Sequence, residues 1–211
     1  MRKMKPSRDK YFKTAPSVIE DSLARSGLRP VAGVDEAGRG ALAGPVVACA
    51  VILPQGLVIN GVNDSKKLSA KLRKELEHEI KKAAVSYAYG IIEAAKIDEI
   101  NILNAALLAM KQAIESLSTP PQAVLADGTY SPSCEAKVIC VKQGDSESHL
   151  IAAASILAKV YRDDIMTGIH EAYPVYGFAS HKGYGTALHR EAIMRHGLSA
   201  EHRKSFRHYA L

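Results

Sequence analysis

The stretch VAGVDEAGRGALAGPVVACAVIL, residues 31–53, decides how the first part of the chain folds. Its two apolar runs, 31–34 and 44–53, are rich in valine, alanine and isoleucine, which favours two strands. Glycines at positions 38, 40 and 44 lie between and at the start of these runs and indicate a turn. Because Asp35 and Glu36 directly follow the first run, we expect two adjacent carboxylates at the end of a strand.

Patterns along the rest of the chain predict the remaining elements. Short apolar runs predict strands at residues 85–92, 123–126 and 136–141. Apolar side chains at helical spacing predict helices at residues 17–26, 69–84, 102–117 and 151–165. Three successive strands followed by alternating helices and strands imply an α/β fold, with a mixed five-stranded sheet flanked by helices.

Composition divides the chain into three parts. Residues 1–27 read as a basic N-terminal extension, and residues 28–169 carry the predicted sheet and its helices. Residues 170–211 hold a glycine-rich stretch and most of the histidines. We expect this last part to form a loop and one or two helices that pack on the core rather than a separate domain.

The overall composition is that of an ordinary globular protein: 47% of the 211 residues are hydrophobic and 24% are charged. The three cysteines show no CxxC spacing, which fits a reducing compartment. No secretion-signal pattern and no apolar run of the ~20 residues needed to span a bilayer occurs, so we expect a cytoplasmic protein without membrane contact. The net charge of +6 suits a polyanionic partner, although a solubilising surface explains it equally well.

Further acids follow the later strands. Asp127 ends the run 123–126, and Asp145 lies shortly after the run 136–141. Ligands of α/β sheets bind beyond the carboxyl ends of the strands, so we expect these acids to face one crevice with Asp35 and Glu36. Neighbouring carboxylates repel one another unless a cation neutralises them, and oxygen ligands select Mg²⁺ or Mn²⁺. Two such ions would support in-line phosphoryl displacement.

Each of these features also has a simpler explanation. Asp127 precedes a glycine and could form a turn, and Asp145 precedes a serine and could cap a helix. The glycine-rich turn at residues 38–40 could cradle a phosphate or sugar, or it could be a plain connection between strands. Tyr184 could stack on a sugar or base, or it could pack a loop onto the core. Spacing alone leaves these alternatives open.

A series of motifs, taken together, resembles the signatures of the ribonuclease HII family, in the family's order. They are GVDEAGRGALAGPVV (33–47), NDSKKLS (63–69), NIL (101–103), DG (127–128), KQGDS (142–146), AASILAKV (153–160), YGFASHKGY (176–184) and HRKSF (202–206). The likeness extends over most of the chain and is highly specific in combination. Ala41 stands where the family usually has proline.

The resemblance implies a ribonuclease H-like fold whose C-terminal segment binds substrate. It implies an endonuclease that hydrolyses the RNA strand of RNA–DNA hybrids and incises 5′ to ribonucleotides embedded in duplex DNA, as in ribonucleotide excision repair. The family's chemistry uses two Mg²⁺ or Mn²⁺ ions and leaves 3′-hydroxyl and 5′-phosphate ends. Its catalytic, metal-binding acids match Asp35, Glu36, Asp127 and Asp145.

The resemblance also assigns the substrate contacts. Gly38, Arg39 and Gly40 match the element whose backbone reads the 2′-hydroxyl, and Tyr184 matches the tyrosine that stacks on the sugar. Two rival functions remain. One is another metal phosphoesterase of this fold, such as a resolvase or exonuclease, which would need no ribonucleotide. The other is a hybrid-binding module without catalysis, against which the four acids argue. We expect a monomer; a contact with a replication clamp cannot be read from the sequence.

Overall fold

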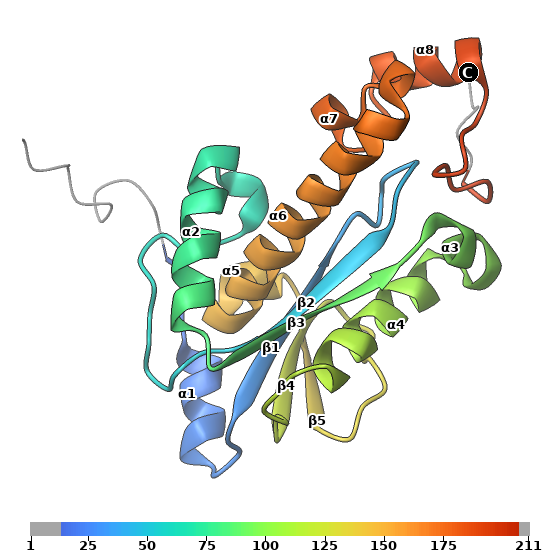
Figure 1. Cartoon of the computed structure of the whole chain (residues 1–211). Coiled ribbons are helices and arrows are strands. Elements are labelled where there is room, and N and C mark those ends of the chain that lie inside the picture. The colour runs from blue at the N-terminus through green and yellow to red at the C-terminus, as the bar shows by residue number, and fades with distance from the viewer. Residues whose placement is uncertain (1–13, 207–211) are drawn as a thin grey trace, which may run out of the picture.

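The computed structural model describes residues 14–206 and places a five-stranded mixed sheet at the centre of the molecule (Figure 1). The strand order is β3-β2-β1-β4-β5; β1 pairs antiparallel with β2 and parallel with β4. The strands are β1 Val31–Ala37, β2 Val46–Ile52, β3 Ser86–Ile92, β4 Ala123–Asp127 and β5 Lys137–Val141. The predicted α/β class and the mixed five-stranded sheet are therefore confirmed.

Helices cover both faces of this sheet. The helices within residues 14–206 are α1 Val18–Arg25, α2 Ala70–Ala83, α3 Ala94–Ile100, α4 Ile102–Glu115, α5 Gly144–Glu147, α6 His149–Ala172, α7 Phe178–His181 and α8 Ala187–His196, with short 3₁₀ turns η2 Ser65–Lys67 and η3 Pro174–Tyr176. Side chains of a strand alternate between the two faces. Cys49 and Val51 of β2 therefore pack with α2 and α6, whereas Ala48 and Ala50 pack with α4.

Strand β1 is longer than its apolar run predicts. It continues to Ala37, and Asp35 and Glu36 pair with Cys49 and Ala48 of β2. The expectation that the two acids lie just past the strand end was wrong, because the β1–β2 ladder carries extended backbone through them. The acids are therefore held by the sheet itself rather than by a loop.

Two helices also differ from the prediction. Helix α6 has 24 residues and extends beyond both ends of the predicted 151–165, beginning where the Ser148 hydroxyl accepts from the backbone N–H of Ile151. Helix α3 was not predicted; it is seven residues long, and Asn101, with φ of 65°, separates it from α4. Helices this short leave little periodicity to detect.

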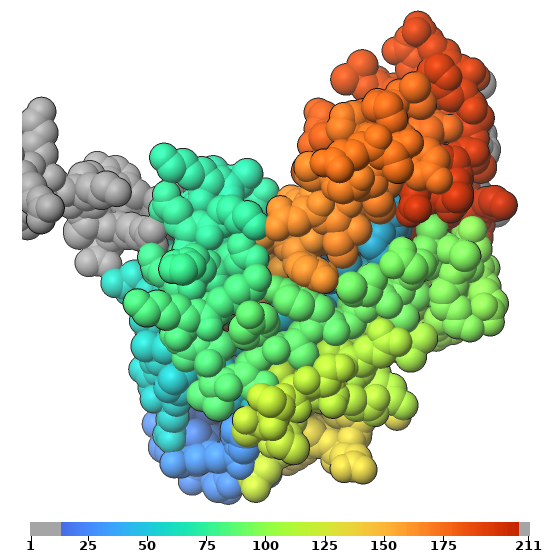
Figure 2. Space-filling view, viewed as in Figure 1, coloured from blue at the N-terminus to red at the C-terminus, as the bar shows by residue number. Residues whose placement is uncertain are grey.

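The C-terminal segment projects from the body of the molecule at the C-terminal end of α6 (Figure 2). Besides the two groups of buried side chains on the faces of the sheet, a further buried cluster joins α6, η3, α7 and α8 through Met166, Tyr176, Phe178 and Ala192. Ala43 from the β1–β2 connection also belongs to this cluster. The segment thus packs against α6 and the β1–β2 connection. No helix within residues 14–206 is long and apolar enough to cross a membrane.

Only part of the predicted basic extension can be placed. Residues 1–13 lie outside the described residues. Helix α1, which follows them, packs against the sheet and buries Glu20 and Ala24. The Glu20 carboxylate accepts hydrogen bonds from the Ser148 hydroxyl (2.6 Å) and the backbone N–H of Leu150 (2.9 Å) at the start of α6.

Candidate active site

Asp35 is the most buried of the four predicted acids, at 4% exposure on the central strand β1. Its Oδ1 accepts the backbone N–H of Glu36 at 2.7 Å. Burial raises the pKa of Asp35 well above its usual value, and the nearby charges of Glu36 and Asp127 raise it further. The side chain is therefore a carboxylate that a nearby cation would stabilise strongly.

Only one of the two carboxylate oxygens of Glu36 has a hydrogen-bond partner among residues 14–206. Its Oε1 lies 3.1 Å from Nη1 of Arg39, whereas Oε2 is buried and has no hydrogen-bond partner among residues 14–206. Burial raises the pKa of Glu36; Arg39 opposes this shift and Asp127 adds to it. Buried polar atoms in proteins are nearly always paired, so the free oxygen needs a ligand to explain it.

Asp127, the last residue of β4, stands beside β1 in the sheet. Its Oδ1 accepts the backbone N–H of Gly144 at 2.7 Å, which ties the end of β4 to the start of α5. This bond joins residues 17 apart in the sequence and is not the local turn that the simpler explanation proposed. The charge of Asp127 also acts on Asp35, Glu36 and Asp145, so that it links all four acids electrostatically.

Asp145 lies in the first turn of α5. The N-cap of that helix is Gln143, so the alternative that Asp145 caps it was wrong. Burial raises the pKa of Asp145; Lys66 opposes the shift, and Asp64 and Asp127 add to it. The Lys66 ammonium lies 3.4 Å from Oδ2 of Asp145 and forms an ion pair with it.

The four acids fit a divalent cation by their chemistry. All supply hard oxygen ligands, three have raised pKa values, and one of their oxygens is buried without a partner. Within the described part of the chain, however, no three Asp, Glu, His or Cys side chains already converge closely enough to hold a metal ion. A bound cation would therefore have to draw these carboxylates together.

The connection between β1 and β2 carries the Gly38-Arg39-Gly40 sequence. Gly38 has a φ of 96°, and a Cβ built on it would overlap Nε of Arg162, so that only glycine fits. Arg39 and Gly40 are exposed, and a Cβ on Gly40 would meet open space. The backbone N–H of Ala41 donates to the Gly38 carbonyl at 3.2 Å, a bond that proline at this position could not make.

Two fully buried arginines stand behind this connection. Arg162 of α6 donates to the carbonyls of Ala43 (3.1 Å) and Pro45 (2.9 Å), and Arg203 donates to those of Arg39 and Gly44 (both 3.0 Å). Burial and the nearby charge of Arg162 together lower the pKa of Arg203 to about 9. These bonds fix carbonyls of the connection toward the protein interior.

Tyr184 lies in the loop after α7, half-buried. The Lys159 ammonium and the Arg162 guanidinium each lie 5.4 Å from the centre of its ring, within cation–π range. Arg162 also donates to the Lys182 carbonyl at 3.0 Å, and the Leu42 N–H donates to the Gly183 carbonyl at 2.8 Å. The structure therefore brings the Tyr184 loop against the segment that follows Gly38-Arg39-Gly40.

Sequence reasoning gave no role to Arg162, Arg203 or Lys66. The latter two lie inside motifs quoted for the resemblance, but their contacts come from distant parts of the chain. Arg162 left one usable signal. It falls at helical spacing with Ile151, Ser155, Ala158 and Met166, and an arginine on such an apolar face is unusual enough to indicate a buried, paired charge.

A five-stranded mixed sheet with acidic side chains on its central strands β1 and β4 is the arrangement of a ribonuclease H-like hydrolase. Residues 32–209 match the family model described as Ribonuclease HII. The chain is 48% identical over 207 residues to ribonuclease HII of Syntrophotalea carbinolica, covering 98% of this chain and 97% of that protein. It is 53% identical over 191 residues to ribonuclease HII of Chlamydia pneumoniae, covering 89% and 88%. The chain belongs to the ribonuclease HII family and is a ribonuclease H enzyme.

Solved structures agree with this assignment. Ribonuclease H2 from Pyrococcus horikoshii superposes with a TM-score of 0.70 at 27% identity, covering 84% of this chain and 94% of that one. Ribonuclease HII of Archaeoglobus fulgidus, solved in a complex with PCNA, gives 0.68 at 26% identity, covering 83% and 94%. A ribonuclease HIII, Bst-RNase HIII, solved with Mn²⁺ shares the fold at a TM-score of 0.66 and 20% identity. The predicted ribonuclease H-like fold is confirmed.

Proposed function

We propose that this enzyme hydrolyses the RNA strand of RNA–DNA hybrids and incises 5′ to single ribonucleotides in duplex DNA. One observation supports this most: four acids are electrostatically linked, three of them on the sheet and Asp145 in α5, and the Gly38-Arg39-Gly40 connection follows two of them on β1. The backbone of that connection is held in place by hydrogen bonds from buried Arg203. The acids would serve phosphodiester hydrolysis. The connection and the Tyr184 loop would select the nucleotide.

Asp35, Glu36, Asp127 and Asp145 would hold Mg²⁺ or Mn²⁺, two ions during catalysis. When bound, such ions lower the pKa of a water molecule and stabilise the negative charge of the leaving oxygen. Their charge would also relieve the repulsion that raises the pKa of Asp35. The expected products carry 3′-hydroxyl and 5′-phosphate ends.

Substrate selection would rest on the 2′-hydroxyl, the group that distinguishes RNA from DNA. Exposed Arg39 and Gly40 offer backbone close to the acids, since Arg39 also pairs with Glu36. Tyr184 offers a ring on which a sugar could stack. Lys66 and Lys67, exposed near Asp145 and Ser146, would position phosphates without reading sequence.

The test is a DNA duplex that contains one ribonucleotide, incubated with Mg²⁺ or Mn²⁺ and, in parallel, with a chelator. We expect a single cut 5′ to the ribonucleotide, lost with the chelator and absent on an all-DNA duplex. Cleavage of the all-DNA duplex would instead indicate a phosphoesterase of broader substrate range. Binding of hybrids without any turnover would indicate a module that has lost catalysis.

The proposal extends to assembly and partners. A single chain supplies all the residues named above, so we propose a cytoplasmic monomer. A contact with a sliding clamp, such as the relative from Archaeoglobus fulgidus makes in its solved complex with PCNA, is compatible with this proposal. Size-exclusion chromatography with light scattering would test the monomer directly.

A further inference from the structure

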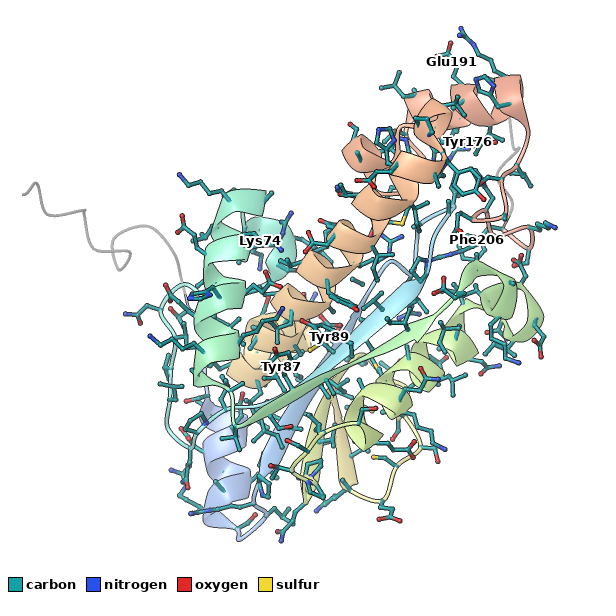
Figure 3. The ribbon with its side chains drawn as sticks, viewed as in Figure 1. Lys74, Tyr87, Tyr89, Tyr176, Glu191 and Phe206 are labelled. Atoms are coloured by element: carbon teal, nitrogen blue, oxygen red, sulfur yellow. The ribbon has the colours of Figure 1, made fainter. Side chains whose placement is uncertain are left out.

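A pair of buried histidines lies inside the C-terminal segment. His189 of α8 and His202 are 0% and 1% exposed, and their Nε2 atoms stand 3.1 Å apart. Aromatic rings enclose the pair: Phe178 lies 5.4 Å from the His189 ring and Tyr176 lies 4.9 Å from the His202 ring, between centroids. Figure 3 shows Tyr176 inside this segment, with Phe206 below it toward α3. The pair is therefore shielded from solvent.

The hydrogen bonds around the pair allow one arrangement of protons. The backbone N–H of Ser199 donates to Nδ1 of His202 at 2.9 Å, so a neutral His202 carries its proton on Nε2. That proton faces Nε2 of His189, which must accept it. His189 then carries its own proton on Nδ1, 3.0 Å from the carbonyl oxygen of Tyr184. The result is a directed chain from Ser199 through both neutral rings to the Tyr184 backbone.

The backbone around the pair joins the same segments. Ala43 and His202 form an isolated β-bridge, and the Arg203 N–H donates to the Leu42 carbonyl at 2.9 Å. The Leu42 N–H in turn donates to the Gly183 carbonyl at 2.8 Å. The segment that follows Gly38-Arg39-Gly40 thus lies between the Tyr184 loop and the strand-like stretch 201–203. The hydrogen bonds from Ser199 through His202 and His189 to the Tyr184 carbonyl provide a second connection between the 201–203 stretch and the Tyr184 loop.

We propose that His189 and His202 are positioning residues that fix the Tyr184 loop relative to the Gly38-Arg39-Gly40 connection, and thereby set the recognition of an isolated ribonucleotide. The inference rests on the proposed function. Neither histidine touches the substrate in this scheme. Their action passes through the Tyr184 carbonyl and through the bridge at Ala43.

The two substrates of the proposed activity should respond differently. A duplex with one ribonucleotide offers a single 2′-hydroxyl, so only one register of binding is productive. A continuous hybrid offers a 2′-hydroxyl at every nucleotide of the RNA strand, and a displaced Tyr184 loop can still find a productive register. Because a misplacement of about 1 Å can reduce turnover about 100-fold, loosening the loop should affect the isolated ribonucleotide far more.

The first experiment compares His189→Ala, His189→Asn and His189→Gln, with His78→Ala on the exposed face of α2 as a matched control. We expect His189→Ala to lower kcat on the single-ribonucleotide duplex about 10- to 100-fold, and on the hybrid less than about 3-fold. Asparagine places an amide N–H where Nδ1 donates and should restore most of the loss; glutamine places it near Nε2 and should not. Equal losses on both substrates, or equal behaviour of the Asn and Gln variants, would overturn the proposal.

The second experiment is a double-mutant cycle between His189→Ala and Tyr184→Ala. If His189 acts through Tyr184, the double variant should lose no more single-ribonucleotide activity than Tyr184→Ala alone. Losses that multiply would show that the histidine acts elsewhere and would refute the inference. Wild-type enzyme that fails to cut the single-ribonucleotide duplex would refute the proposed function itself, so the two failures are distinguishable.

Discussion

Replacing Gly38 by alanine, with Gly40→Ala as its partner, separates two roles of glycine in one short sequence. At Gly38 an alanine would occupy the left-handed region at φ of 96°, which costs about 1–2 kcal/mol. Its Cβ would also displace Arg162, whose guanidinium donates to three carbonyls, at a cost of about 1.5–3 kcal/mol for each charged hydrogen bond lost. Loss of one such bond gives a total of about 2.5–5 kcal/mol.

For a chain of this size, that loss corresponds to a decrease in Tm of about 5–20 °C, at about 2–4 °C per kcal/mol. Gly40→Ala should leave Tm within about 1 °C of wild type, because its Cβ meets open space. It should still reduce cleavage of the single-ribonucleotide duplex, since a methyl group there would stand between the backbone and the sugar. Differential scanning fluorimetry with a parallel cleavage assay measures both effects. A Gly38→Ala protein as stable as wild type would refute the reasoning.

Three further predictions concern the acids and their support. Asp35→Asn should stabilise the chelator-treated protein by about 1–3 kcal/mol at pH 8, because an ionised carboxylate is buried there at a cost. Because the folded-state pKa of Asp35 is raised, the wild-type protein is most stable below the unfolded-state pKa of this group, and it loses stability as pH rises through the folded-state pKa. The stability gain of Asp35→Asn should therefore be smaller at about pH 5 than at about pH 8. Denaturation curves that give the same gain at both pH values would contradict this. Asp127→Asn keeps an oxygen for the Gly144 N–H, so hybrid binding should survive while turnover falls at least about 100-fold; undiminished cleavage would remove Asp127 from the site. Arg162→Lys cannot reach three carbonyls and should lower the free energy of unfolding by about 2–4 kcal/mol in urea titrations, whereas a loss below 1 kcal/mol would show that the carbonyls find other donors.

The strands and the main helices could be predicted because their signals are local. Apolar runs marked the strands, and helical spacing marked α2, α4 and the centre of α6. The continuation of β1 through Asp35 and Glu36 could not be predicted, since it depends on pairing with β2 rather than on the residues themselves. Polar residues normally end an apolar run, so the sequence pattern placed the strand end too early.

The candidate site likewise has a part that could be predicted from the sequence and a part that could not. The four acids could be proposed from their places after the apolar runs, and the resemblance supplied their roles. The support behind them could not be inferred, because its partners are remote in sequence: Arg162 reaches Pro45 across 117 residues, and Arg203 reaches Arg39 across 164. No role was predicted from the sequence for the histidine pair. It is buried, and its direction of hydrogen bonding follows only from the fold.

Helix α6 has a consequence for how this chain can change length. It starts directly after the short helix that carries Asp145, and it holds Arg162 and Met166 further along. One residue inserted between Asp145 and Arg162 would turn everything beyond it by about 100° and advance it by about 1.5 Å, which would carry the guanidinium away from its carbonyls. Insertions and deletions should therefore be excluded from residues 145–166, whereas the exposed loop at residues 54–58 should accept them. The helix therefore sets both the distance and the rotation between the acids and the loops proposed to select the nucleotide.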